Sequence, residues 1–104
     1  MRNYPIIMRV DPKWHVVERY HEETHALKYR YYLDDEERMQ GTVHCYRSDG
    51  TLAETVCYYN GYRHGARTLY DTVGRPYARE YYQRGSFVKR FAVTEDGKEI
   101  QMKW

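Results

Sequence analysis

The glycines and tyrosines of this 104-residue chain recur with a period of about 24 residues. Gly41 and Gly65 lie 24 residues apart, and each is followed five residues later by a tyrosine, Tyr46 or Tyr70. A fixed period of this length is typical of repeat proteins, in which each unit buries its apolar side only against its neighbours. We therefore expect about three and a half units between residues 14 and 97. The register upstream needs two extra residues, which we place in the acidic segment 34–37.

Turn signals divide each repeat into two strands. They are Asp49-Gly50, Asn60-Gly61, Val73-Gly74, Arg84-Gly85 and Asp96-Gly97. Asn-Gly and Asp-Gly favour tight hairpins, because these residues tolerate positive φ angles. The segments between the turns are rich in aromatic and β-branched residues, as strands are: Leu27–Leu33, Leu52–Tyr59, Arg67–Tyr70, Tyr77–Tyr82 and Phe87–Val93. The glycines inside strands, Gly41 and Gly65, are expected at bulges or close backbone approaches.

These signals predict an all-β fold, a single-layer antiparallel meander of β-hairpins. We expect one domain over residues 1–104, with an extended segment at 1–13 and a C-terminal strand at 98–104. The composition agrees with a thin sheet, because Leu, Ile, Val and Phe together provide only 17 residues, whereas tyrosine alone provides 13. Such a sheet holds together only if each buried tyrosine hydroxyl finds a partner.

The composition also excludes several classes of protein. A net charge of +2 provides no basic stripe for nucleic acid. The longest aliphatic stretch, Ile6-Ile7-Met8, is far shorter than the ~20 residues of a membrane span. The N-terminus lacks the apolar region of a signal peptide, so we expect a cytoplasmic protein. Cys45 and Cys57 have neither metal-ligand nor disulfide-framework spacing, and no cofactor is expected.

Residues 54–70 read ETVCYYNGYRHGARTLY, with a glutamate, then Tyr-x-Asn-Gly, then His-Gly, then a tyrosine. This pattern resembles the MORN-variant repeat, and the resemblance covers Gly41–Gly97 and extends back to about Trp14. It implies a fold of stacked hairpins. It also implies a binding role, because bacterial proteins of this type include antitoxins and immunity proteins that silence a toxin, while other MORN proteins are scaffolds.

The segment His21-Glu22-Glu23-Thr24-His25 matches the HExxH motif of zinc metalloproteases. On a helix, His21 and His25 would share one face and bind zinc, with Glu22 as the base. Strand-like alternation begins only two residues later, at Leu27, and the repeat register places the segment in a turn. We therefore expect a polar turn with no metal and no catalytic residue, and we keep a zinc-dependent hydrolase as the alternative.

Two groups of side chains are candidates for contact with a partner protein. The first is the acidic run Asp34, Asp35, Glu36 and Glu37, expected to be a solvated loop that contacts a basic surface. Tyrosines at repeat positions are expected to pack between hairpins; these are Tyr20, Tyr46 and Tyr70, and Tyr32, Tyr58 and Tyr82. The second group lies off these positions and is expected to be exposed: Tyr29, Tyr59, Tyr62 and Tyr77.

These features together predict a non-enzymatic protein-binding module. We expect a small inhibitor that masks a target protein, as antitoxins, immunity proteins and phage anti-defence factors do. The partner is another protein, and neither a membrane nor nucleic acid is expected. A self-associating scaffold is a further alternative, because terminal strands at Tyr4–Val10 and Ile100–Trp104 would leave pairing edges exposed and permit a homo-oligomer.

Overall fold

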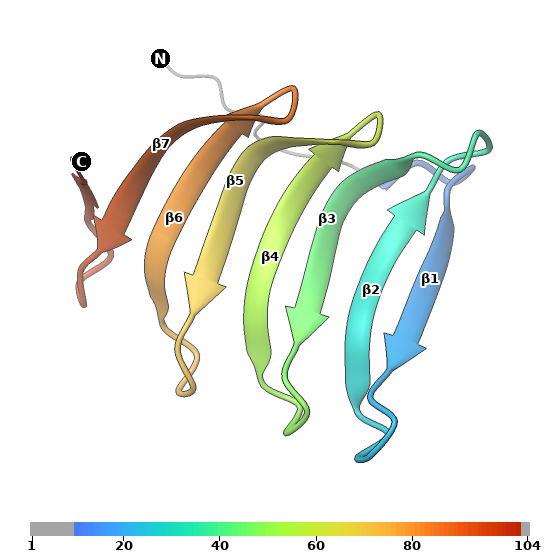
Figure 1. The fold of residues 1–104 in the computed structure, drawn as a ribbon, viewed down its shortest axis with the longest axis horizontal. Coiled ribbons are helices and arrows are strands. Elements are labelled where there is room, and N and C mark those ends of the chain that lie inside the picture. The colour runs from blue at the N-terminus through green and yellow to red at the C-terminus, as the bar shows by residue number, and fades with distance from the viewer. Residues whose placement is uncertain (1–9, 103–104) are drawn as a thin grey trace.

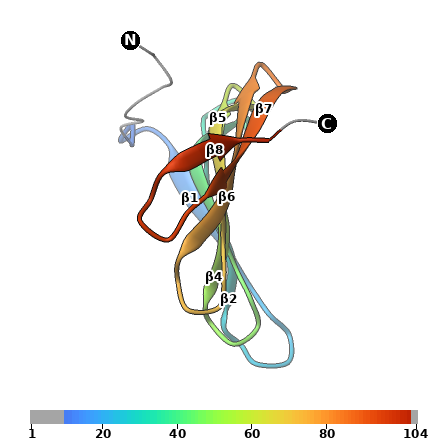
Figure 2. The ribbon, with the colours of Figure 1, turned by 90° about the vertical axis from the view of Figure 1, so that its left-hand side faces the viewer.

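Residues 10–102 form one open antiparallel sheet in the computed structural model, which describes these residues only (Figure 1). Every strand pairs with its neighbours in the chain, so the sheet order is the sequence order. The strands are β1 (His15–Tyr20), β2 (Leu27–Leu33), β3 (Met39–Tyr46), β4 (Leu52–Tyr59), β5 (Tyr62–Tyr70), β6 (Pro76–Gln83), β7 (Ser86–Val93) and β8 (Glu99–Gln101). The predicted all-β, single-layer meander of hairpins is confirmed, and the view along the sheet shows a single twisted layer (Figure 2).

The connections alternate between two edges of the sheet. The upper edge in Figure 1 carries loop 34–38 and the two-residue turns 60–61 and 84–85, and the lower edge carries loops 21–26, 47–51, 71–75 and 94–98. At turn 60–61 both residues have positive φ, 51° for Asn60 and 85° for Gly61. This geometry matches the right-handed twist of the flanking strands, and the predicted turn is confirmed.

The two extra residues of the first repeat are divided between both edges. The register leaves six residues, 21–26, between β1 and β2, but five, 47–51, between β3 and β4. At the upper edge, five residues (34–38) lie between Leu33 and Met39, the last paired residues of β2 and β3. The equivalent pair of β4 and β5 is Tyr58 and Arg63, and only four residues (59–62) lie between them. Our placement of both extra residues in the acidic segment is therefore wrong.

Strand β2 is consequently shifted by one residue relative to the repeat, and a one-residue shift turns every side chain to the other face. Tyr32 lies against Trp14, with ring centroids 6.1 Å apart, on the face opposite to Tyr58. The expected equivalence of Tyr32 and Tyr58 is wrong for this reason. Tyr20 is 55% exposed, so the expected packing also fails there, since β1 has only one neighbouring strand within the described residues.

The small core lies on one face of the sheet. We call it the groove face, and it carries Val43, Val56 and Ala78, which are 3–6% exposed. The other, the back face, carries Tyr32 and Thr68. A single layer cannot bury a thick aliphatic core, and Val43, Val56 and Ala78 are the buried hydrophobic residues of the described part of the chain.

A row of alternating charges crosses the groove face from β4 to β7. Arg67 bonds Glu54 at 2.6 Å and Glu80 at 2.9 Å, and Arg90 bonds Glu80 at 3.1 Å. Burial opposes the ionisation of Glu80, but hydrogen bonds from Arg67 and Tyr82 outweigh it and lower the pKa of this carboxyl. We call these four side chains the charge ladder, and it takes the place of apolar packing over the second half of the sheet.

The termini agree only in part with expectation. The strand expected over Tyr4–Val10 lies outside the described residues except for Val10. The expected C-terminal strand is present as the short β8, which pairs with β7. Residues 10–102 contain no helix with the length and apolar character that a membrane crossing requires.

Candidate functional site

The HEETH segment forms the lower-edge loop between β1 and β2, not a helix. His25 adopts a φ of 63° and its N–H bonds the carbonyl of His21 at 2.9 Å, which closes the turn. The imidazole Nε2 of His21 donates to the carbonyl oxygen of Tyr46 at 2.9 Å. In the next repeat the Arg47 guanidinium makes the equivalent bond to the carbonyl of Tyr70. His21 therefore ties the first hairpin to the second.

This arrangement lacks the geometry of the zinc motif. The motif needs a helical turn to bring its two histidines onto one face, and here the first histidine is engaged by a backbone carbonyl. Among residues 10–102 no group of three or more His, Cys, Asp or Glu side chains is placed to hold a metal ion.

The acidic loop 34–38 contains one buried carboxylate and three exposed ones. Asp34 is only 6% exposed and accepts hydrogen bonds from the N–H groups of Glu36 and Arg38, from Arg38 Nε and from Gln40 Nε2, each at 2.9 Å. The bonds from Gln40 and Arg38 hold the pKa of Asp34 well below its usual range. The expectation that all four acids are solvated is wrong at Asp34, because this carboxylate organises the loop.

The rest of the acidic loop faces solvent. Asp35, Glu36 and Glu37 are exposed, and Glu36 lies 3.4 Å from the Arg38 guanidinium. Glu37 has a φ of 64°, the conformation that a glycine adopts in the lower-edge loops. Asp35 and Glu37 are therefore the carboxylates best placed to meet a partner.

The four off-register tyrosines are all exposed, as expected: Tyr29 by 40%, Tyr59 by 55%, Tyr62 by 60% and Tyr77 by 49%. They do not form one surface. Tyr29 lies on the groove face, whereas Tyr59 and Tyr62 are cross-strand partners on the back face beside turn 60–61. Tyr77 also lies on the back face, but near the lower edge. Only Tyr59 and Tyr62 lie at the same edge as the acidic loop.

Sequence reasoning did not identify an apolar groove of about 470 Å³ over strands β2–β5. Its floor is Val43 and Val56, and its half-buried walls are Tyr31, Leu33, Met39 and Tyr58. Burial raises the pKa of the Cys45 thiol, also in the groove, to about 11, so this thiol stays protonated near neutral pH. The groove is thus apolar and without a reactive nucleophile.

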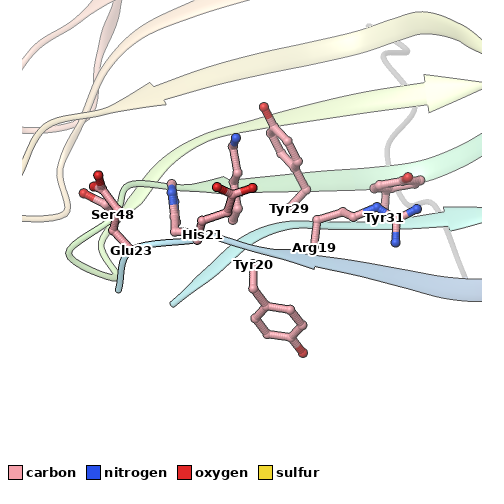
Figure 3. A pocket seen from close by; sticks show the side chains of 9 residues that line it. Arg19, Tyr20, His21, Glu23, Tyr29, Tyr31 and Ser48 are labelled. Carbon is pink, nitrogen blue, oxygen red and sulfur yellow. The ribbon is translucent and has the colours of Figure 1, made fainter. Parts of the chain in front are cut away.

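A polar hollow of about 710 Å³ adjoins this groove (Figure 3). Tyr29 and Tyr31 line both depressions. The hollow is bordered by Arg19 on β1, by His21 and Glu23 of the HEETH loop, and by Ser48 of the next lower-edge loop. Tyr20 also lines the hollow, although Figure 3 shows its side chain pointing away from that of Tyr29. The groove and the hollow together form one surface, with an apolar centre and a charged end.

The fold and this surface define a class, an open-sheet β-hairpin repeat protein with an accessible apolar groove. Comparisons of the chain with protein-family models, with curated proteins and with solved structures find no match.

Proposed function

We propose that this chain is a non-enzymatic protein-binding module that acts as a cytoplasmic inhibitor by masking a target protein. The observation that carries the proposal is the apolar groove with Tyr29 and Tyr31 at its charged end. Protein interfaces combine an apolar centre with a polar rim and are enriched in tyrosine and arginine. Tyrosine anchors supply large contact area with few rotatable bonds. The resemblance of residues 54–70 to the MORN-variant repeat supports the same role.

Electrostatics support a basic partner, although only part of the acidic loop contributes. Asp35 and Glu37 project from the upper edge with no ion pair among the described residues. Exposed rim charges mainly accelerate encounter with an oppositely charged surface. Changing Asp35 and Glu37 to lysine, with Asp34 retained, should slow association and reduce its salt dependence, and should leave the sheet intact.

The test of the proposal is capture of the target by the immobilised chain from the native host, followed by affinity measurement with the purified target. Tyr29→Ala and Tyr31→Ala should each weaken binding by about 10-fold or more, as truncated interface anchors do. Tyr77→Ala is the matched control, because this tyrosine is exposed on the back face and lines neither the groove nor the hollow, and it should bind like the wild type.

Two results would contradict the proposal. Equal affinity of the wild type and both groove variants would place the contact elsewhere. Retention of nothing but further copies of this chain, with a multimeric mass by light scattering, would support the scaffold instead.

A further inference from the structure

A second depression lies at the upper edge of the back face, away from the groove. It is a hollow of about 480 Å³ lined by Tyr59, Asn60, Tyr62, His64 and Arg84. The two tyrosines are directly opposite each other on β4 and β5 and are the most exposed of the off-register tyrosines. We call this depression the tyrosine slot. It contains two aromatic walls and one guanidinium group.

The walls of the slot are held in place by their neighbours. The ring of Tyr59 lies 6.0 Å from the ring of His64. The ring of Tyr62 rests on turn 84–85, where a Cβ on Gly85 would come within 3.3 Å of Tyr62 Cδ1. A glycine at this position therefore leaves room for the Tyr62 side chain against the turn. Both aromatic rings are pre-positioned in the unliganded protein, which lowers the entropy lost on binding.

The backbone beside the slot is fixed as well. The N–H of Arg84 donates to Nδ1 of His64 at 3.3 Å, and the N–H of Asn60 donates to Oε1 of Gln40 at 3.0 Å. Because Nδ1 accepts this bond, the neutral imidazole of His64 carries its proton on Nε2. That N–H is a donor suited to a backbone carbonyl of a bound segment.

The guanidinium of Arg84 has no ion pair within the described part of the chain. Arg38, which lies farther along the same edge, is by contrast bonded to Asp34 and Glu36. Arg84 is exposed and is the cation available to a ligand in the slot.

We propose that the tyrosine slot binds an acidic, proline-containing segment of a partner protein in the polyproline II conformation. Proline-rich segments dock between aromatic rings in this way because the conformation is pre-formed and its carbonyl groups are open to donors. Arg84 lines the slot together with both tyrosines, and turn 84–85 lies against the ring of Tyr62. A carboxylate next to a proline that packs on the tyrosine rings is therefore within reach of the Arg84 guanidinium.

A nucleic acid is a poorer fit to the same rings. Binding of a phosphate backbone needs a basic track, whereas along the described part of this edge Arg38 is already paired with Asp34 and Glu36, and loop 34–38 adds the exposed carboxylates of Asp35 and Glu37. An isolated carboxylate on a protein segment matches one guanidinium without requiring a track. The proposal concerns a site separate from the groove, so its outcome is independent of the groove's role.

The experiment is an NMR titration of the full chain with a capped heptapeptide of five prolines between two terminal glutamates. In this peptide a carboxylate adjoins the proline run at each end, so a proline in the slot can have an acidic neighbour in either binding direction. Chemical-shift changes should be confined to the amides of the slot, above all those of Gly61 and Gly85. A peptide with terminal lysines in place of the glutamates should bind about 10-fold more weakly.

Three variants separate the two interactions. Tyr62→Ala should weaken binding about 10-fold, whereas Tyr77→Ala, on the same face near the other edge, should leave it unchanged. Arg84→Asn keeps a residue that tolerates the positive φ of 50° at this turn. The Arg84→Asn variant should bind the glutamate peptide and the lysine peptide with equal affinity.

Absence of shifts at millimolar peptide, shifts centred on the groove, or equal binding of both peptides to the wild type would overturn the proposal. Tighter binding of a single-stranded oligonucleotide than of the glutamate peptide would also overturn it. The wild-type shift map decides the location of the site even if Tyr62→Ala fails to fold.

Discussion

Glu80 is the side chain on which the charge ladder most depends. Its carboxylate is buried and accepts bonds from Arg67 at 2.9 Å, Tyr82 at 2.9 Å and Arg90 at 3.1 Å. Glu80→Gln keeps the volume but replaces one acceptor oxygen with a donor that faces a guanidinium. Arg67 keeps Glu54, but Arg90 loses its carboxylate partner, and its Nε already has no hydrogen-bond partner.

We expect Glu80→Gln to lower the free energy of unfolding by about 2–3 kcal/mol, since hydrogen bonds to charged groups contribute about 1.5–3 kcal/mol each and part of the loss is recovered by hydration. For a domain of this size the melting temperature should fall by about 10 °C. Urea unfolding followed by circular dichroism gives the free energy. Glu54→Gln, at the more exposed end of the ladder, where Glu54 is bonded to Arg67, is the control and should cost about 1 kcal/mol.

The pH dependence supplies an independent check. Because the pKa of Glu80 is lowered in the folded protein, the stabilisation is fully present above the unfolded glutamate pKa of about 4.3 and is lost as the pH falls toward the folded pKa. The difference between wild type and variant should therefore be constant from neutral pH to about 4.3 and shrink below it. Equal stability of the two proteins at neutral pH would refute the ladder as a stabilising element.

Three further substitutions test individual packing arguments by thermal and urea unfolding. Gly41→Ala should cost about 2–3 kcal/mol, because φ is +77° and the new Cβ would lie 3.2 Å from the Trp14 ring. Its control, Gly74→Ala, has a φ of +93° and open space around the new Cβ, and should cost about 1 kcal/mol. Equal costs for the two variants would show that the Trp14 contact does not matter for stability. His21→Ala should cost about 1 kcal/mol from the lost carbonyl bond, and elemental analysis of untagged protein should find well under one zinc per chain, so stoichiometric zinc lost in the variant would restore the metal hypothesis. Tyr58→Ala should cost about 2–3 kcal/mol as a large-to-small change in a half-buried wall, and an unchanged midpoint would show that Tyr58 does not support the groove.

The meander and most of its turns were predictable because their signals are local. Asn60-Gly61 identifies a hairpin by residue type alone, and Leu27–Leu33 and Leu52–Tyr59 were predicted with the observed bounds. The glycines inside strands were expected at bulges or close approaches, and Gly41 indeed lies under Trp14. The conformation of loop 34–38 was harder to predict, because Glu37 adopts a positive φ at a position where most lower-edge loops have glycine. The residue type therefore gave no turn signal there.

The candidate site was less predictable, because it depends on which face each strand presents. Exposure of Tyr29 and Tyr59 followed from their positions off the repeat, but their separation onto opposite faces depends on the one-residue shift of β2. The burial of Asp34 depends on a hydrogen bond from Gln40, a residue outside the acidic run that the sequence pattern does not connect with it. The alternating Tyr29, Tyr31 and Leu33 were the only sequence signal for the groove.

The bonds that tie consecutive hairpins recur with the repeat, and this gives the sheet an adjustable width. His21 bonds the carbonyl of Tyr46, and Arg47 bonds that of Tyr70, so each of the first two hairpins carries the attachment for the next. Duplication of one 24-residue unit would widen the sheet by about 10 Å, two strand spacings, without requiring a new core. The width of such a sheet can therefore change in evolution in steps of one whole hairpin.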